Sequence, residues 1–366
     1  MKVLILGGTG AMGAPLVDIL SDQGHEVYVT SRKQQQTALC NVHYIVGNAK
    51  DNAFLESILN KNFDVLIDFM FYHTEEFKSR INILLRNVNQ YIFLSSSRVF
   101  SNLDNELIDE DSPRLLDTLN DNEYLSTDEY ALAKAREEDL LKRSMFNNWT
   151  IIRPYITYND ERLQLGSMEK EIWLHRAMNG KSIIFSKDVA EKYTTLTNGY
   201  DVAYRISKLM GNEKVLCQIY NIASCEYIKW KEVLNIYLNE LECILRKRPN
   251  VIWLDTSSQM MSFLAPYPIK YDRMFNRKFN NHKIQDILEE NISFIETQNG
   301  LKKCLDNFIY ENHNFRFIDY KVEGKIDRIT GEKSDVFQIK GLKNRVKYII
   351  YRFIIPTNTP IYKKNL

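Results

Sequence analysis

The chain has 366 residues, of which 44% are hydrophobic and 26% are charged, and its formal net charge is +1. A chain of this length and composition buries a substantial core, which excludes a wholly disordered polypeptide and fits two domains or one domain with a large additional lobe. The near-neutral charge argues against a protein that captures nucleic acid by bulk electrostatic attraction, so we expect no nucleic-acid partner.

The first half of the chain alternates apolar, β-branched runs with amphipathic stretches. This alternation predicts βαβ units, and hence a parallel sheet with helices on both faces. We therefore predict the α/β fold class, with a Rossmann-type doubly wound parallel sheet. The predicted strands are Val3–Leu6, Val27–Thr30, Val42–Val46, Val65–Phe69 and Tyr91–Leu94, and the helical stretches between them include 16–20, 54–59 and 77–85.

A strong helix follows an acidic, turn-rich excursion over residues 102–128. Ser126 and Glu129 have the spacing of a capping box, and the residues from 131 to 141 are rich in helix formers. We divide the chain into three parts: a Rossmann domain over residues 1–154, to which segments near 190–222 return, a smaller C-terminal α/β substrate-binding lobe over 155–330, and a basic, aromatic extension over 331–366.

The extension differs in charge from the rest of the chain. From Val336 to Leu366 there is no Asp or Glu, but there are seven Lys or Arg residues around the apolar and aromatic run Val346–Ile355. We expect an extra strand or helix that packs on the body or on a second subunit. The alternative is an interfacial segment that is attracted to an anionic membrane surface.

Two absences bear on the location of the protein. No apolar run approaches the roughly 18 residues that a membrane-spanning helix needs. The five cysteines are scattered without a CxxC pair, which is typical of reduced thiols and of neither a disulfide framework nor a zinc ribbon. We expect a cytoplasmic protein.

A glycine-rich turn joins the first strand to the first helix. Its three regularly spaced glycines would permit a tight turn, let the backbone approach a pyrophosphate, and let helix and strand pack closely. The N-terminus of the following helix supplies free N–H groups and a partial positive charge to the phosphates. The predicted dinucleotide-binding residues here are Gly7, Gly8, Thr9, Gly10, Ala11, Met12 and Gly13.

The end of the second strand bears on the choice of dinucleotide. NAD sites normally place a carboxylate there to accept from the ribose 2′-hydroxyl, but no Asp or Glu stands between Glu26 and Asp51. Ser31 and Arg32 supply a hydroxyl and a guanidinium instead, which match a 2′-phosphate. We therefore prefer NADP to NAD as the cofactor.

A candidate acid/base pair lies on the strong helix. Tyr130 and Lys134 are four residues apart, so they share one face, and a nearby cation stabilises the phenolate that acid/base work needs. The predicted strand Tyr91–Leu94 is followed by Ser95, Ser96 and Ser97. They lie at its C-terminal end, where parallel sheets have their ligand-binding sites.

In these motifs, taken in this order, the chain resembles the extended or atypical branch of the short-chain dehydrogenase/reductase superfamily, the NAD(P)-dependent epimerases and dehydratases. The run Asp64–Phe100 is most similar to atypical members of the chloroplast-stem-loop-protein type. The resemblance implies that Tyr130 is the general acid/base and that Lys134 holds the nicotinamide ribose. It also implies that Ser96, with Ser97 as a substitute, polarises the reacting oxygen, and that Asp51 approaches the adenine.

Three departures from the family pattern matter. Met70 and Phe71 stand where the family prefers small residues near the cofactor, so we expect Met70 to contact and crowd the nicotinamide. Ser101 replaces the glycine that usually follows the serine strand. The sequence Ser96-Ser97-Arg98 lacks the Asp-Glu pair of sugar-nucleotide 4,6-dehydratases, which disfavours dehydratase chemistry.

Other chemistries find no support in the sequence. The six histidines show neither HExxH nor any paired spacing, so no metal is expected. No GxSxG elbow indicates a serine hydrolase, and no GxxxxGK[ST] loop indicates a nucleoside triphosphate site.

Two hypotheses follow. The first is an NAD(P)-dependent epimerase or ketoreductase acting at a hydroxyl or keto carbon of a nucleotide-linked sugar, a substrate class that the resemblance implies. The second is a non-catalytic dinucleotide-binding sensor or RNA-associated protein, as some atypical relatives are. The resemblance also implies a homodimer, paired through the helices at about Glu75–Arg86 and Asp128–Arg143.

Overall fold

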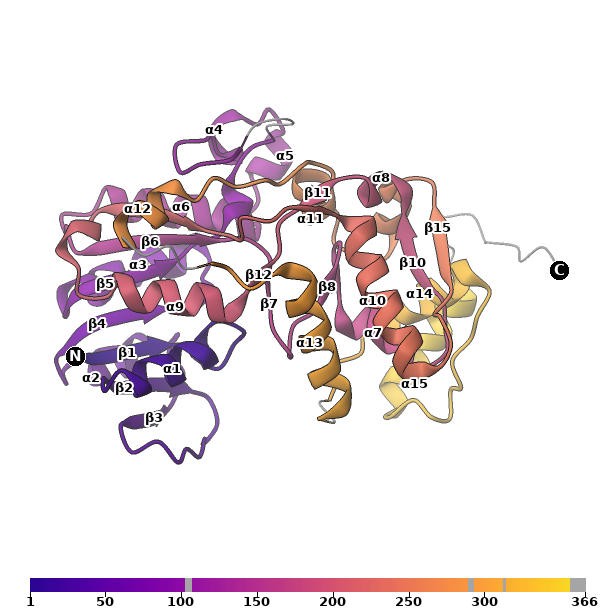
Figure 1. Ribbon diagram of the computed structural model, residues 1–366, viewed down its shortest axis with the longest axis horizontal. Coiled ribbons are helices and arrows are strands. Elements are labelled where there is room, and N and C mark those ends of the chain that lie inside the picture. The colour runs from indigo at the N-terminus through magenta and orange to yellow at the C-terminus, as the bar shows by residue number, and fades with distance from the viewer. Residues whose placement is uncertain (103–106, 289–292, 312–313, 356–366) are drawn as a thin grey trace.

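The computed structural model describes residues 1–102, 107–288, 293–311 and 314–355 and shows two lobes side by side (Figure 1). One lobe is built on a seven-stranded sheet whose strands are all parallel, in the order β13-β6-β5-β4-β1-β2-β3. The predicted Rossmann-type α/β fold is confirmed. The strands are β1 (Lys2–Leu6), β2 (Glu26–Ser31), β3 (Val42–Val46), β4 (Phe63–Asp68), β5 (Val88–Leu94), β6 (Trp149–Pro154) and β13 (Gln218–Ile222).

Alternation along each strand gives the sheet two apolar faces. In β1, Val3 and Ile5 face one helical layer, and Leu4 and Leu6 face the other. The first layer contains α1 (Gly13–Asp22), α9 (Gly199–Leu209) and α12 (His282–Leu288), and the second contains α2 (Asn52–Leu59), α3 (Thr74–Arg86) and α6 (Tyr130–Lys142).

The strand order reverses at β1, which lies between β2 and β4. Loops at the carboxyl ends of β1 and β4 diverge to opposite faces at such a switch point and leave a crevice there. The glycine turn follows β1 directly, so the fold places it beside this crevice.

The second lobe consists of short strands and helices around an aromatic core. Trp173 and Tyr237 stack there with ring centroids 4.4 Å apart. Its elements are β7 (Thr157–Tyr158), β8 (Gln164–Leu165), β9 (Met168–Glu169), α7 (Lys170–Met178), β10 (Ile183–Ser186), α8 (Lys187–Ala190), β11 (Tyr193–Thr194), β12 (Thr197–Asn198), β14 (Ile228–Lys229), α10 (Trp230–Leu245), β15 (Val251–Leu254), α11 (Pro266–Pro268) and α13 (Thr297–Tyr310).

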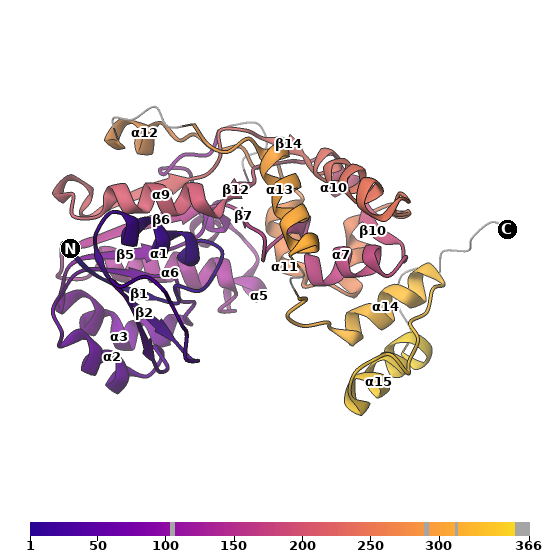
Figure 2. The ribbon, with the colours of Figure 1, turned by 60° about the horizontal axis from the view of Figure 1, so that its bottom comes forward.

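The chain passes between the lobes several times. After β6 it enters the second lobe, returns for α9 and β13, leaves again for α10, and returns once more for α12 before α13 (Figures 1 and 2). The segments near 190–222 thus include α9 and β13 of the first lobe.

The helical extension, as we call residues 320–355, lies at the far end of the second lobe (Figure 2). It contains α14 (Tyr320–Thr330) and α15 (Leu342–Ile349), whose helix continues over Ile350–Ile354 and packs against α14. Of the two forms expected for this run, the structure therefore shows a helix. Residues 356–366 of the predicted tail lie outside the described residues.

The start of α6 corrects the predicted capping box. The N-cap is Glu129, whose carboxylate accepts from the Ala131 N–H at 2.9 Å, whereas the Ser126 hydroxyl donates to the carbonyl of Glu123. The excursion before α6 contains α4 (Leu115–Thr118) and α5 (Asn122–Leu125), and its residues 103–106 lie outside the described part. Among the described helices, none is both long and apolar enough to cross a membrane.

Candidate functional site

The glycine turn has the geometry that a phosphate cradle needs. A Cβ on Gly13 would stand 2.6 Å from the Gly8 backbone, and one on Gly8 would stand 2.8 Å from Cγ1 of Val29, so these glycines allow the close packing of turn, helix and sheet. A Cβ on Gly10 would meet no atom within 4 Å, so Gly10 leaves its backbone approachable. No side chain caps α1 at Met12. The turn therefore fits the pyrophosphate of a dinucleotide.

A cavity of about 760 Å³ extends from this turn across the carboxyl end of the sheet. Ser31 and Arg32 lie in its wall, and its described lining has three cations and no carboxylate. Asp51 is outside this lining, since its carboxylate caps α2 by accepting from the Phe54 N–H at 3.1 Å. The lining residues are Gly7, Thr9, Thr30, Ser31, Arg32, Lys33, Gln35, Gly47, Asn48, Ala49, Lys50, Met70 and Phe71.

A second, smaller cavity of about 150 Å³ brings Tyr130 and Lys134 together with Met12 of the glycine turn. Met70 and Phe71 line both cavities, so the two adjoin at these side chains. The Phe71 ring lies 5.5 Å from the Tyr130 ring. The bulky side chains of Met70 and Phe71, which we expected to crowd the nicotinamide, thus lie where the two cavities meet.

Lys134 is buried among carboxylates and an aromatic ring. Its Nζ lies 3.0 Å from Oε2 of Glu137, donates to the Met70 carbonyl at 3.2 Å, and stands 4.4 Å from the centre of the Phe93 ring. Burial raises the pKa of Glu137 to about 7, although the charge of Lys134 opposes this. The charge state of Glu137 therefore changes near neutral pH.

Asp68 ends β4 and adds a second buried carboxylate to this region. It accepts from the hydroxyl of Tyr91 at 2.9 Å, from that of Tyr72 at 3.0 Å and from the Met70 N–H at 2.9 Å. Burial raises the pKa of Asp68, and these hydrogen bonds and Lys134 act in the opposite direction.

The three serines after β5 have different partners. Ser95 lines the smaller cavity and donates to Glu138 at 2.5 Å. Ser96 accepts from the Arg98 N–H at 3.2 Å, and Ser97 is fully buried and donates to the Arg153 carbonyl at 2.9 Å. The role of Ser96 or Ser97 toward a substrate oxygen stays a prediction.

Three arginines in the wall of the smaller cavity were missed in the sequence. Arg98 stands 5.5 Å from the centre of the Tyr130 ring and is held by Glu129 at 2.8 Å. Arg162 and Arg273 come from the second lobe. Burial, together with the charges of Arg98 and Arg162, lowers the pKa of Arg273 to about 10. With Lys134, the wall has four basic side chains and, among its described residues, no acidic one.

No group of three or more His, Cys, Asp or Glu side chains in the described part of the chain is arranged to hold a metal ion. Five of the histidines, His25, His43, His73, His175 and His282, lie in this part, whereas His313 lies outside it.

A model of the NAD(P)H-binding family matches residues 7–196, just over half of the chain. The chain belongs to this family. Its match begins at the glycine turn and includes Tyr130 and Lys134. The chain also has the fold of the extended short-chain dehydrogenase/reductases, as the resemblance implied.

One curated relative in the comparison is the chloroplast stem-loop binding protein of 41 kDa b of Arabidopsis thaliana. It is 27% identical over 242 residues, and the match covers 62% of this chain but only 60% of the relative's length.

Two solved structures share the fold of this family member. Epimerase Mth375 from Methanothermobacter thermautotrophicus is 13% identical with a TM-score of 0.66, over 85% of this chain and 92% of that one. UDP-glucuronic acid 4-epimerase from Bacillus cereus is 14% identical with a TM-score of 0.62, over 86% of this chain and 100% of that one.

Proposed function

We propose that the protein is an NAD(P)-dependent oxidoreductase or epimerase that acts at a hydroxyl or keto carbon of a nucleotide-linked sugar. The adjoining cavities carry this proposal: one lies along the glycine turn, the other contains Tyr130 and Lys134, and Met70 and Phe71 line both. A dinucleotide laid along the turn would end beside the acid/base pair.

In the proposed reaction, Tyr130 takes the proton of the substrate hydroxyl while the same carbon gives up a hydride, which leaves a ketone. In the reverse direction Tyr130 returns the proton to the oxygen. A bound nicotinamide supplies the hydride chemistry, accepting the hydride or giving it back. Lys134 holds the nicotinamide ribose and stabilises the phenolate, and Ser96 polarises the reacting oxygen. Return of the hydride to the other face of the ketone would make an epimerase, and a single delivery would make a ketoreductase.

The cationic wall supports an anionic substrate. Glu129, Glu137, Glu169 and Asp272 pair with Arg98, Lys134, Arg162 and Arg273, yet none of these carboxylates is in the lining. The cavity therefore presents positive groups to its contents, which is favourable for the negatively charged phosphates of a nucleotide-linked sugar. The Bacillus cereus epimerase binds UDP-glucuronic acid with NAD.

We propose NADP as the preferred cofactor. Arg32 and Lys33 are exposed at the end of β2 in the wall of the larger cavity, where a 2′-phosphate would find two cations and the Ser31 hydroxyl. NAD is the alternative, since an epimerase recycles its cofactor and gains nothing from the reduced NADP pool.

Replacing Tyr130 tests the proposal. Tyr130→Phe removes the acid/base group but keeps the ring against Phe71, so turnover should fall by about a hundredfold or more while NADP(H) still binds more tightly than NAD(H). Steady-state rates and equilibrium titrations measure the two effects. Tyr200→Phe, at a tyrosine on α9 that is 48% exposed, is the matched control. Full turnover by Tyr130→Phe would contradict the proposed mechanism.

A non-catalytic, RNA-associated protein is the second candidate, because the curated relative is by name a stem-loop binding protein. Specific stem-loop binding by a chain that turns over no sugar nucleotide would favour it. For either function we propose a homodimer through α3 and α6, which lie side by side in the sheet's second layer.

A further inference from the structure

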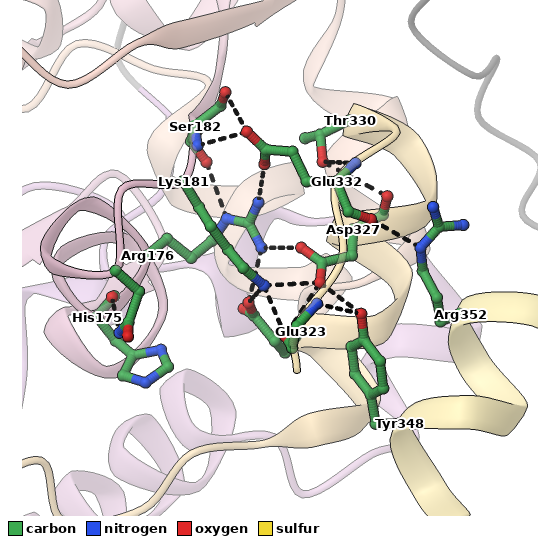
Figure 3. Close-up of polar contacts among 12 residues, drawn as sticks. His175, Arg176, Lys181, Ser182, Glu323, Asp327, Thr330, Glu332, Tyr348 and Arg352 are labelled. Carbon is green, nitrogen blue, oxygen red and sulfur yellow. Dashed lines mark hydrogen bonds and ion pairs between the residues drawn. The ribbon is translucent and has the colours of Figure 1, made fainter. Parts of the chain in front are cut away.

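The helical extension is joined to the second lobe by a buried cluster of charges (Figure 3). Arg176 at the end of α7 is 1% exposed, and its guanidinium binds Glu323 at 2.9 Å, Asp327 at 2.8 Å and Glu332 at 2.6 Å. Lys181 binds Glu323 and Asp327 at 2.7 Å each. This ion cluster takes up three of the acidic side chains of the extension.

The same cluster fixes the inner side of α15. The Tyr348 hydroxyl donates to Asp327 at 2.7 Å, and Tyr348 is fully buried. A Cβ on Gly324 would stand 2.9 Å from the Tyr348 carbonyl, so glycine allows α14 and α15 to approach closely. The side of α15 that carries Tyr348 therefore packs on the rest of the protein. We call this its inner face, and the opposite, solvent-exposed side its outer face.

That outer face is apolar. Leu342, Val346, Ile349 and Phe353 are spaced by four, three and four residues, which puts them on one side of the helix. They are 76%, 47%, 38% and 57% exposed. Phe337 and Ile354 beside them are 85% and 67% exposed. Six large apolar side chains exposed within 18 residues form a surface that water disfavours.

Basic residues surround this apolar stripe. Lys340 and Lys343 are exposed, and Arg345, Lys347 and Arg352 lie along the same helix. The carboxylates of Glu323 and Asp327 are buried in the ion cluster, whereas Lys347 pairs with Asp319 at 3.0 Å and Asp335 is exposed, so Lys340 and Lys343 supply most of the exposed positive charge. We propose that this face of the helical extension, residues 337–354, binds the surface of an anionic lipid membrane, with the stripe among the acyl chains and the cations at the headgroups.

The combination of positive charge and apolar surface on this face favours an anionic membrane over a second copy of the chain or RNA. A two-fold contact between copies of this chain would bring the same cations together, and lysine is depleted from protein interface cores. An RNA backbone would satisfy the cations but would leave the aliphatic members of the stripe, Leu342, Val346 and Ile349, in water. An anionic bilayer satisfies both kinds of group. The extension lies at the end of the molecule away from the seven-stranded sheet, so binding there leaves the dinucleotide cavity open (Figure 1).

Flotation with lipid vesicles tests the proposal on the full chain. The protein should float with vesicles of phosphatidylcholine containing phosphatidylglycerol, far less with phosphatidylcholine alone, and less as salt is added. Leu342→Ser/Phe353→Ser should lower the partition coefficient by about tenfold or more through loss of apolar contact. Lys340→Gln/Lys343→Gln should lower it by about tenfold through loss of charge.

Matched controls use exposed side chains of the same kinds elsewhere. Met145→Ser, at a site that is 88% exposed, and Lys303→Gln on α13 should bind vesicles as the parent chain does. Absence of flotation, or equal flotation with neutral vesicles, would overturn the proposal. So would a Leu342→Ser/Phe353→Ser variant that dissociates an oligomer in light scattering while its vesicle binding is unchanged, because the stripe would then be a subunit interface.

Discussion

At the scale of single residues, the carboxylates behind Lys134 control the charge beside Tyr130. Glu137 pairs with Lys134 at 3.0 Å from the same helix, and Asp68 and Asp128 contribute, after burial, to its raised pKa. When Glu137 ionises, its negative charge offsets the lysine and makes a Tyr130 phenolate less favourable. We therefore predict that Glu137 is a positioning residue that acts on the proposed acid/base through Lys134.

Glu137→Gln should shift the acidic limb of the pH–rate profile to lower pH, by roughly one unit, because a neutral amide no longer offsets Lys134. A raised carboxyl pKa also means that the parent chain loses stability as pH rises through about 7, and the variant should lack this loss. Rates and denaturation curves between about pH 5 and 9 measure both effects. Glu75→Gln, at a side chain that is 82% exposed, is the control, and identical profiles for parent and Glu137→Gln would contradict the role.

At the scale of elements, the glycine turn and α1 act as a unit. Gly8 and Gly13 contact each other and the sheet, whereas Gly10 faces open space. The first residue of α9, Gly199, also packs against this turn, since a Cβ there would stand 2.1 Å from the Ala11 carbonyl. Within this motif, Gly8 and Gly13 therefore allow close packing, whereas Gly10 leaves room for a ligand.

This division predicts different outcomes for two alanine variants. Gly10→Ala should keep the stability of the parent chain but weaken dinucleotide binding, because its methyl group would occupy the space that a pyrophosphate needs. Gly13→Ala should lower both stability and binding, because its Cβ would meet the Gly8 backbone at 2.6 Å. Thermal denaturation with and without NADP(H) separates the two. Equal loss of stability in both variants would refute the division.

The turn, the sheet and the Tyr130–Lys134 pair could be predicted because local patterns specify them: strand alternation, glycine spacing and i, i+4 geometry. The start of α6 was predicted wrongly because Glu129 caps it instead of Ser126, although glutamate is not among the residue types that usually cap a helix N-terminus. Arg162 and Arg273 could not be found, because irregular segments of the second lobe bring them to the cavity and no local period marks such contacts.

At the scale of the whole molecule, the ion cluster connects segments about 150 positions apart in the chain, since Arg176 and Asp327 are 151 residues apart. Burial opposes ionisation of Asp327, but the charges of Arg176 and Lys181 outweigh it and hold its pKa below the usual range. Stability from this carboxylate is therefore present near neutral pH and is lost as pH falls through its folded pKa.

Arg176→Met should destabilise the protein by about 3–5 kcal/mol at neutral pH, because it leaves buried carboxylates without their main partner. Hydrogen exchange should increase over residues 320–354, and the difference from the parent chain should narrow as pH falls below about 4 toward the lowered pKa of Asp327. Arg248→Met breaks an exposed pair with Glu242 and should cost less than about 1 kcal/mol. A similar cost for both variants would argue against a stabilising role of the ion cluster.

The repeated passage of the chain between the lobes limits how this architecture can be recombined. The strand β13 and the helices α9 and α12 belong to the nucleotide-binding lobe, yet they are encoded after segments of the other lobe. A chimera that exchanged everything after residue 154 would remove one edge of the parallel sheet and most of one covering layer. Grafting a new substrate specificity onto this scaffold therefore requires several separate junctions, placed where the chain crosses from one lobe to the other.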